Sequence, residues 1–256
     1  MEPLPNTSSY FASAKPRIFA HRGFALEAPE NTLLAFAKAL AAGATHLETD
    51  VQASLDGVAV LSHDPDLRRL AGRSVRVDQL TFGELRRVAL GQGQVFCSLA
   101  QALDAFPAAS FNIDIKAAAA VEPTAAAIQA ANASGRVLIT SFSDSRRAAA
   151  LRLLPDAATS ASSRAFVAAI AAGKLGTTPL LQRFVRGIDA VQTPEYFRGM
   201  LIASERTIRR LHDVGVEVHV WTVNDATAME RLLDRGVDGL VTDRTDLAVT
   251  VVSNRR

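Results

Sequence analysis

The chain has 256 residues, of which 48% are hydrophobic and 21% are charged, and this composition favours one folded domain with a large core over a disordered chain. The formal net charge is +2 and the arginine pairs are scattered without interleaved aromatics, so we expect no nucleic-acid partner. The single cysteine, the polar N-terminus and the lack of a long apolar run predict no intrachain disulfide, no integral membrane segment and a cytoplasmic location.

Short β-branched segments alternate with alanine- and leucine-rich segments along the chain, a pattern that indicates βαβ units and a parallel sheet. The predicted strands are Arg17–His21, Thr45–Val51, Val58–His63, Phe111–Lys116, Val137–Ser141, Ala157–Ser160, Ile188–Gln192, Val216–Thr222 and Gly239–Thr242. The predicted helices include Asn31–Ala42, Ser145–Leu154, Ser162–Gly173, Ser204–Val214 and Ala226–Arg235.

These strands are one too many for an eight-stranded barrel, and the dipeptide Asp56-Gly57 accounts for the extra one. Asp-Gly between two extended segments is a strong signal for a tight turn, so Val58–His63 is predicted to fold back as a hairpin arm. The remaining eight strands, in a chain near the roughly 250 residues typical of the fold, predict a single α/β domain, a (β/α)8 TIM barrel.

The predicted barrel domain covers residues 16–256 and follows a flexible N-terminal tail, residues 1–15. Asp64–Ser110 is predicted to be a short insertion over one end of the barrel. Within it, Thr81–Leu90 and Leu99–Phe106 have helical composition.

Three carboxylates are predicted at the C-terminal ends of the strands, where TIM-barrel active sites lie. Glu48 and Asp50 are two residues apart on one strand, so their side chains share a face, and Asp114 has the same parity. Adjacent buried carboxylates repel each other, and a hard divalent cation, Mg²⁺ or Ca²⁺, would relieve that repulsion with oxygen ligands. The alternative is a structural ion network with Arg22 and Lys116.

Two histidines, His21 and His63, close neighbouring strands beside these carboxylates. Because histidine exchanges protons near neutral pH, such a pair can serve as general acid and general base. Arg22 and Lys116 could bind a phosphate, and Trp221 offers an apolar wall for a substrate.

Other residues in these segments have structural interpretations. His46 and His219 point to the same face of their strands as the site residues. They should lie deeper in the barrel, as core histidines whose ring nitrogens are hydrogen-bonded. Asn31 is a candidate N-cap of the first helix and a brace for the loop after His21.

Nine short segments occur in the order of a known family, over roughly residues 17–246. They are A-H-R-G (Ala20–Gly23), P-E-N-T (Pro29–Thr32), L-E-T-D-V (Leu47–Val51), D-G (Asp56-Gly57), S-H-D-P (Ser62–Pro65), I-D-I-K (Ile113–Lys116), S-F (Ser141-Phe142), V-W-T-V-N (Val220–Asn224) and G-L-V-T-D (Gly239–Asp243). Together they resemble the glycerophosphodiester phosphodiesterase family.

The resemblance implies a metal-dependent enzyme that cleaves a glycerophosphodiester to glycerol 3-phosphate and an alcohol. It implies that His21 and His63 are the acid–base pair and that the carboxylates already named hold one divalent cation, with Arg22 and Lys116 on the phosphate. Asp114 departs from the family, which usually has the longer Glu at this position. The shorter side chain requires a metal closer to that strand or a bridging water.

Asp114 is also reminiscent of the sphingomyelinase D branch of the same barrel superfamily, which raises a lipid-directed phosphodiesterase of lysophospholipase D or sphingomyelinase D type as an alternative. This alternative ranks second because the insertion is expected to have no exposed aromatic cluster. An alternative of another class is a catalytically silent barrel that only binds phosphodiesters. No pattern in the sequence indicates an oligomeric state.

Overall fold

Eight parallel strands form the central sheet of the protein in the computed structural model, which describes residues 9–175 and 178–255. The strands are β1 (Arg17–Ala20), β2 (His46–Ala53), β6 (Ser110–Ile115), β7 (Val137–Thr140), β8 (Ala158–Thr159), β9 (Ala190–Thr193), β12 (Glu217–Val220) and β13 (Gly239–Thr242). Their order is β8-β7-β6-β2-β1-β13-β12-β9. A parallel bridge between Ser160 and Ala190 joins the two ends, so the barrel is nearly closed.

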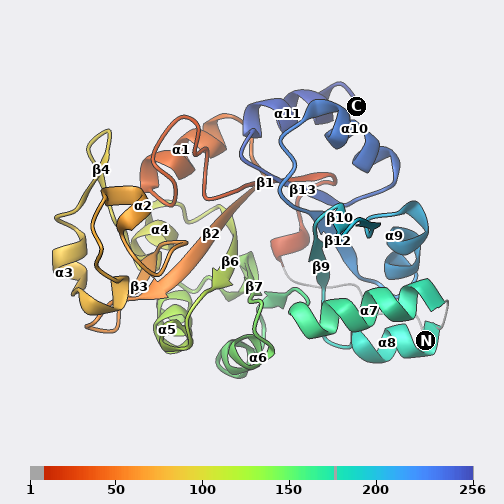
Figure 1. Ribbon diagram of the computed structural model, residues 1–256, viewed down its shortest axis with the longest axis horizontal. Helices are drawn as coiled ribbons and strands as arrows, with labels where there is room; N and C mark the ends of the chain where they lie inside the picture. The colour runs from red at the N-terminus through yellow and green to blue at the C-terminus, as the bar shows by residue number, and fades with distance from the viewer. Residues whose placement is uncertain (1–8, 176–177, 256) are drawn as a thin grey trace.

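Helices surround this barrel, as Figure 1 shows. They are α1 (Leu33–Ala41), α5 (Val121–Ala130), α6 (Asp144–Leu153), α7 (Ser163–Leu175), α8 (Thr178–Phe184), α9 (Glu205–His212), α10 (Ala226–Asp234) and α11 (Thr245–Ser253), with short 3-10 turns at η1 (Ser9–Phe11), η3 (Ala118–Ala120) and η4 (Ser134–Arg136). The predicted (β/α)8 TIM barrel is therefore confirmed. In the part of the chain that the structure describes, no helix is long and apolar enough to cross a membrane.

The extra strand and the insertion lie together beside β2, at the left of Figure 1. As predicted from Asp56-Gly57, β3 (Ala59–Leu61) turns back and pairs antiparallel with β2, with Val51 opposite Leu61. The insertion then forms α2 (Arg68–Ala71), η2 (Val77–Gln79), α3 (Phe82–Leu85), the hairpin β4 (Ala89–Gly91) and β5 (Gln94–Val95), and α4 (Leu99–Ala105). A small separate core holds it together.

The helix predicted over Thr81–Leu90 is wrong in its second half. Its start is well specified, because Thr81 and Glu84 form a reciprocal capping box. The helix ends at Leu85 because Val88 is buried in the core of the insertion and Gly91 and Gly93 have positive φ angles that make a hairpin turn.

The predicted flexible tail is also wrong for residues 9–15, while residues 1–8 lie outside the described residues. Tyr10 is fully buried under the barrel, with its ring 4.8 Å from that of His46. Phe11 accepts a 2.7 Å hydrogen bond from Arg17, and Lys15 pairs with Asp238 at 2.6 Å. The sequence pattern does not predict this packing, because the segment covers the bottom of the barrel without forming a strand of the sheet and so shows no strand periodicity.

Aromatic and apolar side chains fill the lower half of the barrel. Phe19 lies between His46 and His219, with ring centroids 4.7 and 4.6 Å away. Gly239 leaves room for that ring, since a Cβ there would lie 2.5 Å from Phe19 Cε2. Both histidines are fully buried, as predicted, and burial lowers the pKa of His46 to about 3, which keeps its ring neutral. Among the described residues, these side chains fill the base of the barrel.

Candidate active site

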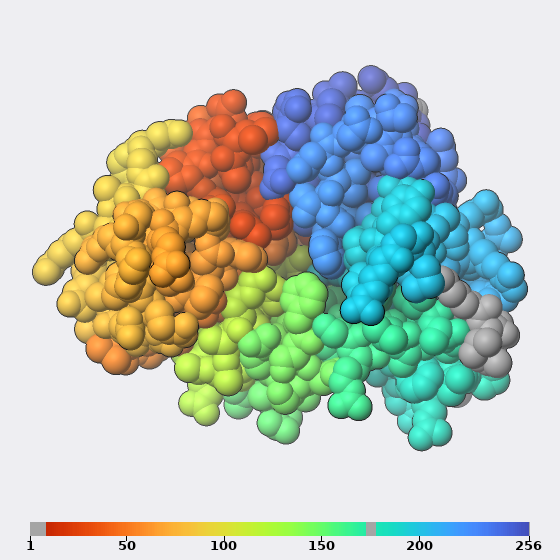
Figure 2. Space-filling view, viewed as in Figure 1, coloured from red at the N-terminus to blue at the C-terminus, as the bar shows by residue number. Residues whose placement is uncertain are grey.

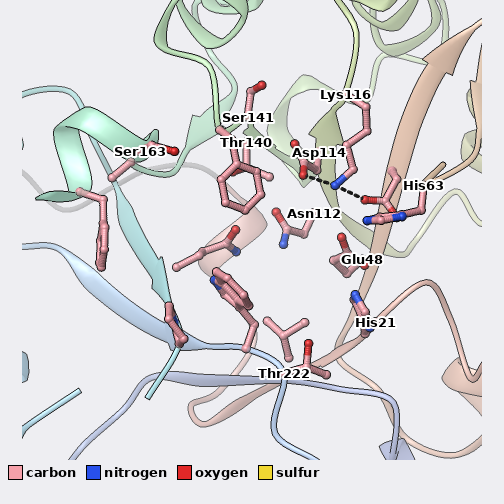
Figure 3. A pocket seen from close by; sticks show the side chains of 18 of the residues that line it. His21, Glu48, His63, Asn112, Asp114, Lys116, Thr140, Ser141, Ser163 and Thr222 are labelled. Atoms are coloured by element: carbon pink, nitrogen blue, oxygen red, sulfur yellow. Dashed lines mark hydrogen bonds and ion pairs between the residues drawn. The ribbon is translucent and has the colours of Figure 1, made fainter. Parts of the chain in front are cut away.

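A pocket of about 350 Å³ opens at the C-terminal ends of the strands. All eight side chains singled out in the sequence line it, namely His21, Arg22, Glu48, Asp50, His63, Asp114, Lys116 and Trp221. Figure 3 shows His21, His63, Glu48, Asp114 and Lys116 gathered on one side of the pocket. Strand parity and strand ends thus locate these residues correctly.

Each of the two pocket histidines is held by a carboxylate at Nδ1. His21 Nδ1 lies 2.7 Å from Asp243 Oδ1, and His63 Nδ1 lies 2.7 Å from Asp64 Oδ1. A proton on Nδ1 therefore donates to the carboxylate, and Nε2 is left to exchange a proton with a substrate. Burial lowers the pKa of His21, but the hydrogen bond to Asp243 and the charge of Glu48 outweigh it and raise the pKa above its ordinary value.

Two further residues fix these carboxylates. Asn224 donates to Asp243 Oδ2 at 2.7 Å and accepts from the Asp243 backbone N–H at 2.9 Å. Arg69, on α2, donates to Asp64 at 2.6 Å and to both oxygens of Glu30 at 2.7 Å. Each histidine is thus oriented through a carboxylate that is itself anchored.

The loop after β1 places Arg22 by an unusual backbone path. Arg22 and Gly23 both have positive φ, and a Cβ on Gly23 would lie 2.7 Å from Ala35 Cβ, so only glycine fits. The predicted N-cap at Asn31 is wrong, because Thr32 caps α1. Asn31 instead has φ 56° and accepts from Thr49 at 2.7 Å, while its N–H bonds Arg22 O at 2.9 Å, so its predicted role as a brace for this loop holds.

The three carboxylates are buried side by side in the pocket. Burial and the charge of Asp50 raise the pKa of Glu48 to about 7. Burial likewise raises the pKa of Asp114, although Lys116 opposes it. For Asp50 the same burial is outweighed by Lys116 and Arg22, which hold the pKa below its usual range.

Lys116 bridges two of these carboxylates. Its Nζ lies 2.8 Å from Asp50 Oδ1 and 2.6 Å from Asp114 Oδ2. Arg22 Nε lies 3.1 Å from Asp50 Oδ2 in an ion pair that lacks hydrogen-bond geometry. Part of the structural ion network considered from the sequence is therefore present, centred on Asp50.

The donor set nevertheless suits a cation. Among the described residues, no three carboxylates or histidines are placed to hold an ion as they stand. Within the same part of the chain, however, Asp114 Oδ1 is buried without a hydrogen-bond partner, and Glu48 is buried with a raised pKa. Both groups are all-oxygen donors whose burial a divalent ion would compensate.

Sequence reasoning missed the carboxylates that hold the histidines. Asp64 directly follows His63, and Asp243 directly follows the last strand, which pairs with β1 in the barrel. That strand-end position is the signal that could have identified Asp243. The aromatic residues Phe142, Phe166 and Phe197, which also line the pocket, were missed as site residues, since each lies on a loop, a helix or a short hairpin outside the barrel strands.

Comparison with known proteins agrees with this geometry. Residues 21–247 match the Glycerophosphoryl diester phosphodiesterase family. The protein named "Probable glycerophosphodiester phosphodiesterase 2" of Mycobacterium tuberculosis is 44% identical over 238 residues, covering 92% of this chain and 90% of the relative.

Solved structures share the fold. A glycerophosphodiester phosphodiesterase from Agrobacterium tumefaciens matches with a TM-score of 0.76 at 24% identity, over 93% of this chain and 99% of that one. An Oleispira antarctica phosphodiesterase in complex with the product sn-glycerol-3-phosphate matches with a TM-score of 0.76 at 20% identity, over 93% of this chain and 97% of that one. With its family match over most of its length, this chain belongs to the glycerophosphoryl diester phosphodiesterase family.

Proposed function

We propose that the protein hydrolyses a glycerophosphodiester to glycerol 3-phosphate and an alcohol, with one divalent cation, Mg²⁺ or Ca²⁺, and with two histidines as acid and base. The observation that carries the proposal is the pair His21 and His63, each tied at Nδ1 to a carboxylate beside Arg22 and Lys116. Family membership supports the same reaction.

In the proposed reaction, a hydroxyl of water or of the substrate's own glycerol attacks phosphorus while the bond to the leaving alcohol oxygen breaks. Attack by water gives glycerol 3-phosphate directly, whereas attack by the glycerol hydroxyl gives a cyclic phosphate, which a water molecule then opens to glycerol 3-phosphate. Nε2 of one histidine accepts the proton of the attacking hydroxyl, and Nε2 of the other donates a proton to the departing oxygen. Asp243 and Asp64 hold the two rings in their orientation, and Asp243 also stabilises the protonated form of His21. Arg22 and Lys116 bind the phosphate oxygens, where negative charge increases in the transition state.

The residues that would hold the cation are Glu48, Asp50 and Asp114. A bound divalent cation would polarise the phosphate and offset the charge of the three carboxylates. Lys116, which now bridges Asp50 and Asp114, would exchange one of these contacts for a phosphate oxygen. The low pKa of Asp50 keeps at least this ligand ionised near neutral pH.

The test is the release of glycerol 3-phosphate from glycerophosphocholine and glycerophosphoethanolamine, with EDTA and then with Mg²⁺ or Ca²⁺ restored. We expect EDTA to stop release and the metal to restore it. No release under any metal would contradict the proposed reaction and favour first the lipid-directed phosphodiesterase and then the silent binding barrel.

Histidine variants test the acid–base pair. His21→Ala and His63→Ala should each abolish turnover while the protein still unfolds cooperatively on heating. The matched control is His212→Ala, since His212 lies on α9 outside the pocket and bonds Asp238 instead. Wild-type rates in both pocket variants would refute the assignment.

A further inference from the structure

A buried amide in the pocket takes no part in the reaction proposed above. Asn112, on β6, lines the pocket and is 2% exposed. Among the described residues, its amide oxygen Oδ1 is buried without a hydrogen-bond partner. Figure 3 shows the amide turned into the pocket, beside Glu48 and below Asp114. Asn112 therefore presents an unused hydrogen-bonding group to a ligand in the pocket.

The strand register explains the depth at which Asn112 lies. In the parallel pairing of β6 with β2, Asn112 is opposite Glu48 and Asp114 is opposite Asp50. Asn112 and Asp114 are two residues apart, so their side chains share the face that points into the barrel. Because β6 ends at Ile115, Asn112 lies further from the strand end than Asp114 does. Its amide thus forms part of the floor of the pocket, level with Glu48.

The pocket opens on the face of the molecule that Figure 2 shows, where the N-terminal, middle and C-terminal segments meet. The hairpin of β10 (Tyr196–Phe197) and β11 (Met200–Leu201), in cyan, lies on this face, and Phe197 lines the pocket. Because the strand ends are directed towards this opening, a ligand that enters here meets Lys116 first and reaches Asn112 last.

An unpaired amide in the interior is unfavourable for the fold. Burying a polar group without a hydrogen bond costs free energy, and most buried amides in proteins have a partner. A leucine, which is similar in size, would avoid this cost at position 112 and would leave the backbone hydrogen bonds of β6 unchanged. The presence of Asn112 is therefore better explained by a ligand than by the fold.

The chemistry of the amide selects one part of the substrate. An amide carries a carbonyl acceptor and N–H donors, and a hydroxyl can pair with either, because it both donates and accepts. A phosphate oxygen can only accept, and in the proposed reaction Arg22 and Lys116 already bind the phosphate. The glycerol moiety is the part of the product that carries hydroxyls.

The distance from the phosphate is consistent with this choice. Lys116 Nζ lies 2.6 Å from Asp114 Oδ2, so a phosphate bound by Lys116 lies near the level of Asp114. Two residues along a strand span about 6.6 Å, which separates that level from Asn112. The three carbons and the ester oxygen of the glycerol moiety can bridge this distance and place a hydroxyl at the amide.

We propose that Asn112 binds a hydroxyl of the substrate's glycerol moiety and makes the site selective for glycerol over alcohols without further hydroxyls. One hydroxyl donates to Oδ1, and Nδ2 can donate to the second one. This inference rests on the proposed phosphodiesterase function and assigns a specificity-determining residue to it. A substrate without these hydroxyls leaves the amide unpaired when it binds, which is how a buried polar group rejects an analogue.

The test compares glycerol 3-phosphate with propyl phosphate, which has the same carbon chain without hydroxyls. Calorimetric titration of the metal-loaded protein gives both dissociation constants without turnover. The wild type should bind glycerol 3-phosphate at least about tenfold more tightly, and in Asn112→Leu this preference should fall by a similar factor, as expected for the loss of a buried hydrogen bond. Equal binding of the two ligands by the wild type would overturn the inference without any variant.

Two further measurements separate glycerol binding from other roles of Asn112. The affinity of Asn112→Leu for Mg²⁺ or Ca²⁺ alone should equal that of the wild type, and a tenfold loss would make Asn112 a metal ligand and overturn the inference. The melting temperature should not fall, because Oδ1 has no partner to lose among the described residues. A variant that melts earlier but keeps the wild-type preference would assign Asn112 to the fold and overturn the inference as well.

Thr124→Val is the matched control. Thr124, on α5, is fully buried, and in the described part of the chain its Oγ1 also has no hydrogen-bond partner, but it does not line the pocket. The substitution removes an unpaired polar atom from the interior and should leave the preference for glycerol 3-phosphate unchanged. An equal change in both variants would contradict the role of Asn112. A wild-type protein that releases no glycerol 3-phosphate from any phosphodiester would instead overturn the proposed function, and this inference with it.

Discussion

At the scale of single residues, the orientation of the two histidines depends on groups that do not face the substrate. Asp243 fixes His21, and Asn224 fixes Asp243 with a 2.7 Å hydrogen bond. A histidine whose Nδ1 is tied to a carboxylate keeps the same tautomer through the reaction, so its Nε2 is always the atom that exchanges the proton. Asp243 is therefore a positioning residue.

Asp243→Asn should lower kcat by on the order of 10²-fold or more, because the amide can present its N–H to His21 Nδ1 and favour the wrong tautomer. Since the hydrogen bond to Asp243 raises the pKa of His21, its loss should also move the limb of the pH–rate profile due to His21 to lower pH. Steady-state kinetics between pH 5 and 9 measure both effects.

The matched control for this substitution is Asp246→Asn. Asp246 is on α11, only three positions later, and forms an exposed pair with Arg244. Its kinetics should equal those of the wild type. An Asp243→Asn profile that decreases in height without moving along the pH axis would indicate general disruption and not a loss of positioning.

At the scale of elements, the insertion supports the site through Arg69 in addition to Asp64, the carboxylate that holds His63. Arg69 on α2 joins Asp64, which follows the hairpin arm, to Glu30 in the loop after β1. Glu30 in turn lies 3.2 Å from Arg22. Because the loops of both histidines are tied to the same guanidinium, their separation depends on α2.

Arg69→Gln should lower kcat by about tenfold, since a small displacement of His63 relative to His21 is costly to catalysis. The melting temperature should hardly change, because Arg69 is 48% exposed and ion pairs at the surface stabilise little. Arg68→Gln, at the adjacent exposed position on the same short helix, should change neither quantity. A loss of stability equal to the loss of activity would mean that Arg69 serves the fold and not the site.

Local sequence patterns predicted the barrel strands and helices well, because short β-branched segments alternate with alanine- and leucine-rich segments along the chain. Parity on β2 placed Glu48 and Asp50 on one face, and Asp56-Gly57 identified the hairpin arm of β3. The hairpin β10–β11 and the end of α3 were not predictable in this way. Both depend on glycines with positive φ and on contacts with other segments, and two-residue strands have no periodicity to detect.

At the scale of the whole molecule, the segment before β1 closes the bottom of the barrel. Tyr10 is fully buried there and packs against the cluster of Phe19, Leu138 and Val241. The local sequence pattern did not predict the burial of this segment, because the side chains that cover it belong to strands far away in the sequence. The core beneath the site therefore combines the segment before β1 with side chains from β1, β7 and β13.

Tyr10→Ala should destabilise the protein by about 3 kcal/mol, as expected for truncating a large buried aromatic side chain. Tyr196→Ala is the matched control, because Tyr196 is 53% exposed on β10 and should cost much less. Urea unfolding measures both free energies. Equal midpoints for the two variants would mean that the packing of Tyr10 against the barrel contributes little to stability.

A buried carboxylate at the bottom of the barrel contributes to the response of the protein to acid. Asp238, before β13, accepts hydrogen bonds from Val218 N and His212 Nε2 at 2.7 Å and from Lys15 Nζ at 2.6 Å. Burial opposes ionisation of Asp238, but these bonds outweigh it and lower its pKa to about 2. Because the folded pKa lies below the unfolded value, the ionised carboxylate stabilises the fold above about pH 4, and this contribution is lost as the pH falls towards 2.

Asp238→Asn should therefore cost about 2 kcal/mol at pH 7 and flatten the dependence of unfolding free energy on pH between about 4 and 2. Asp78→Asn is a suitable comparison, because Asp78 pairs with Arg76 at the surface, where an ion pair stabilises little, and should change that dependence much less. Urea unfolding at a series of pH values gives both curves. If the curve of Asp238→Asn ran parallel to that of the wild type, another group would carry the acid response, whereas convergence of the two curves at low pH would assign it to the carboxylate that links Lys15, α9 and β12.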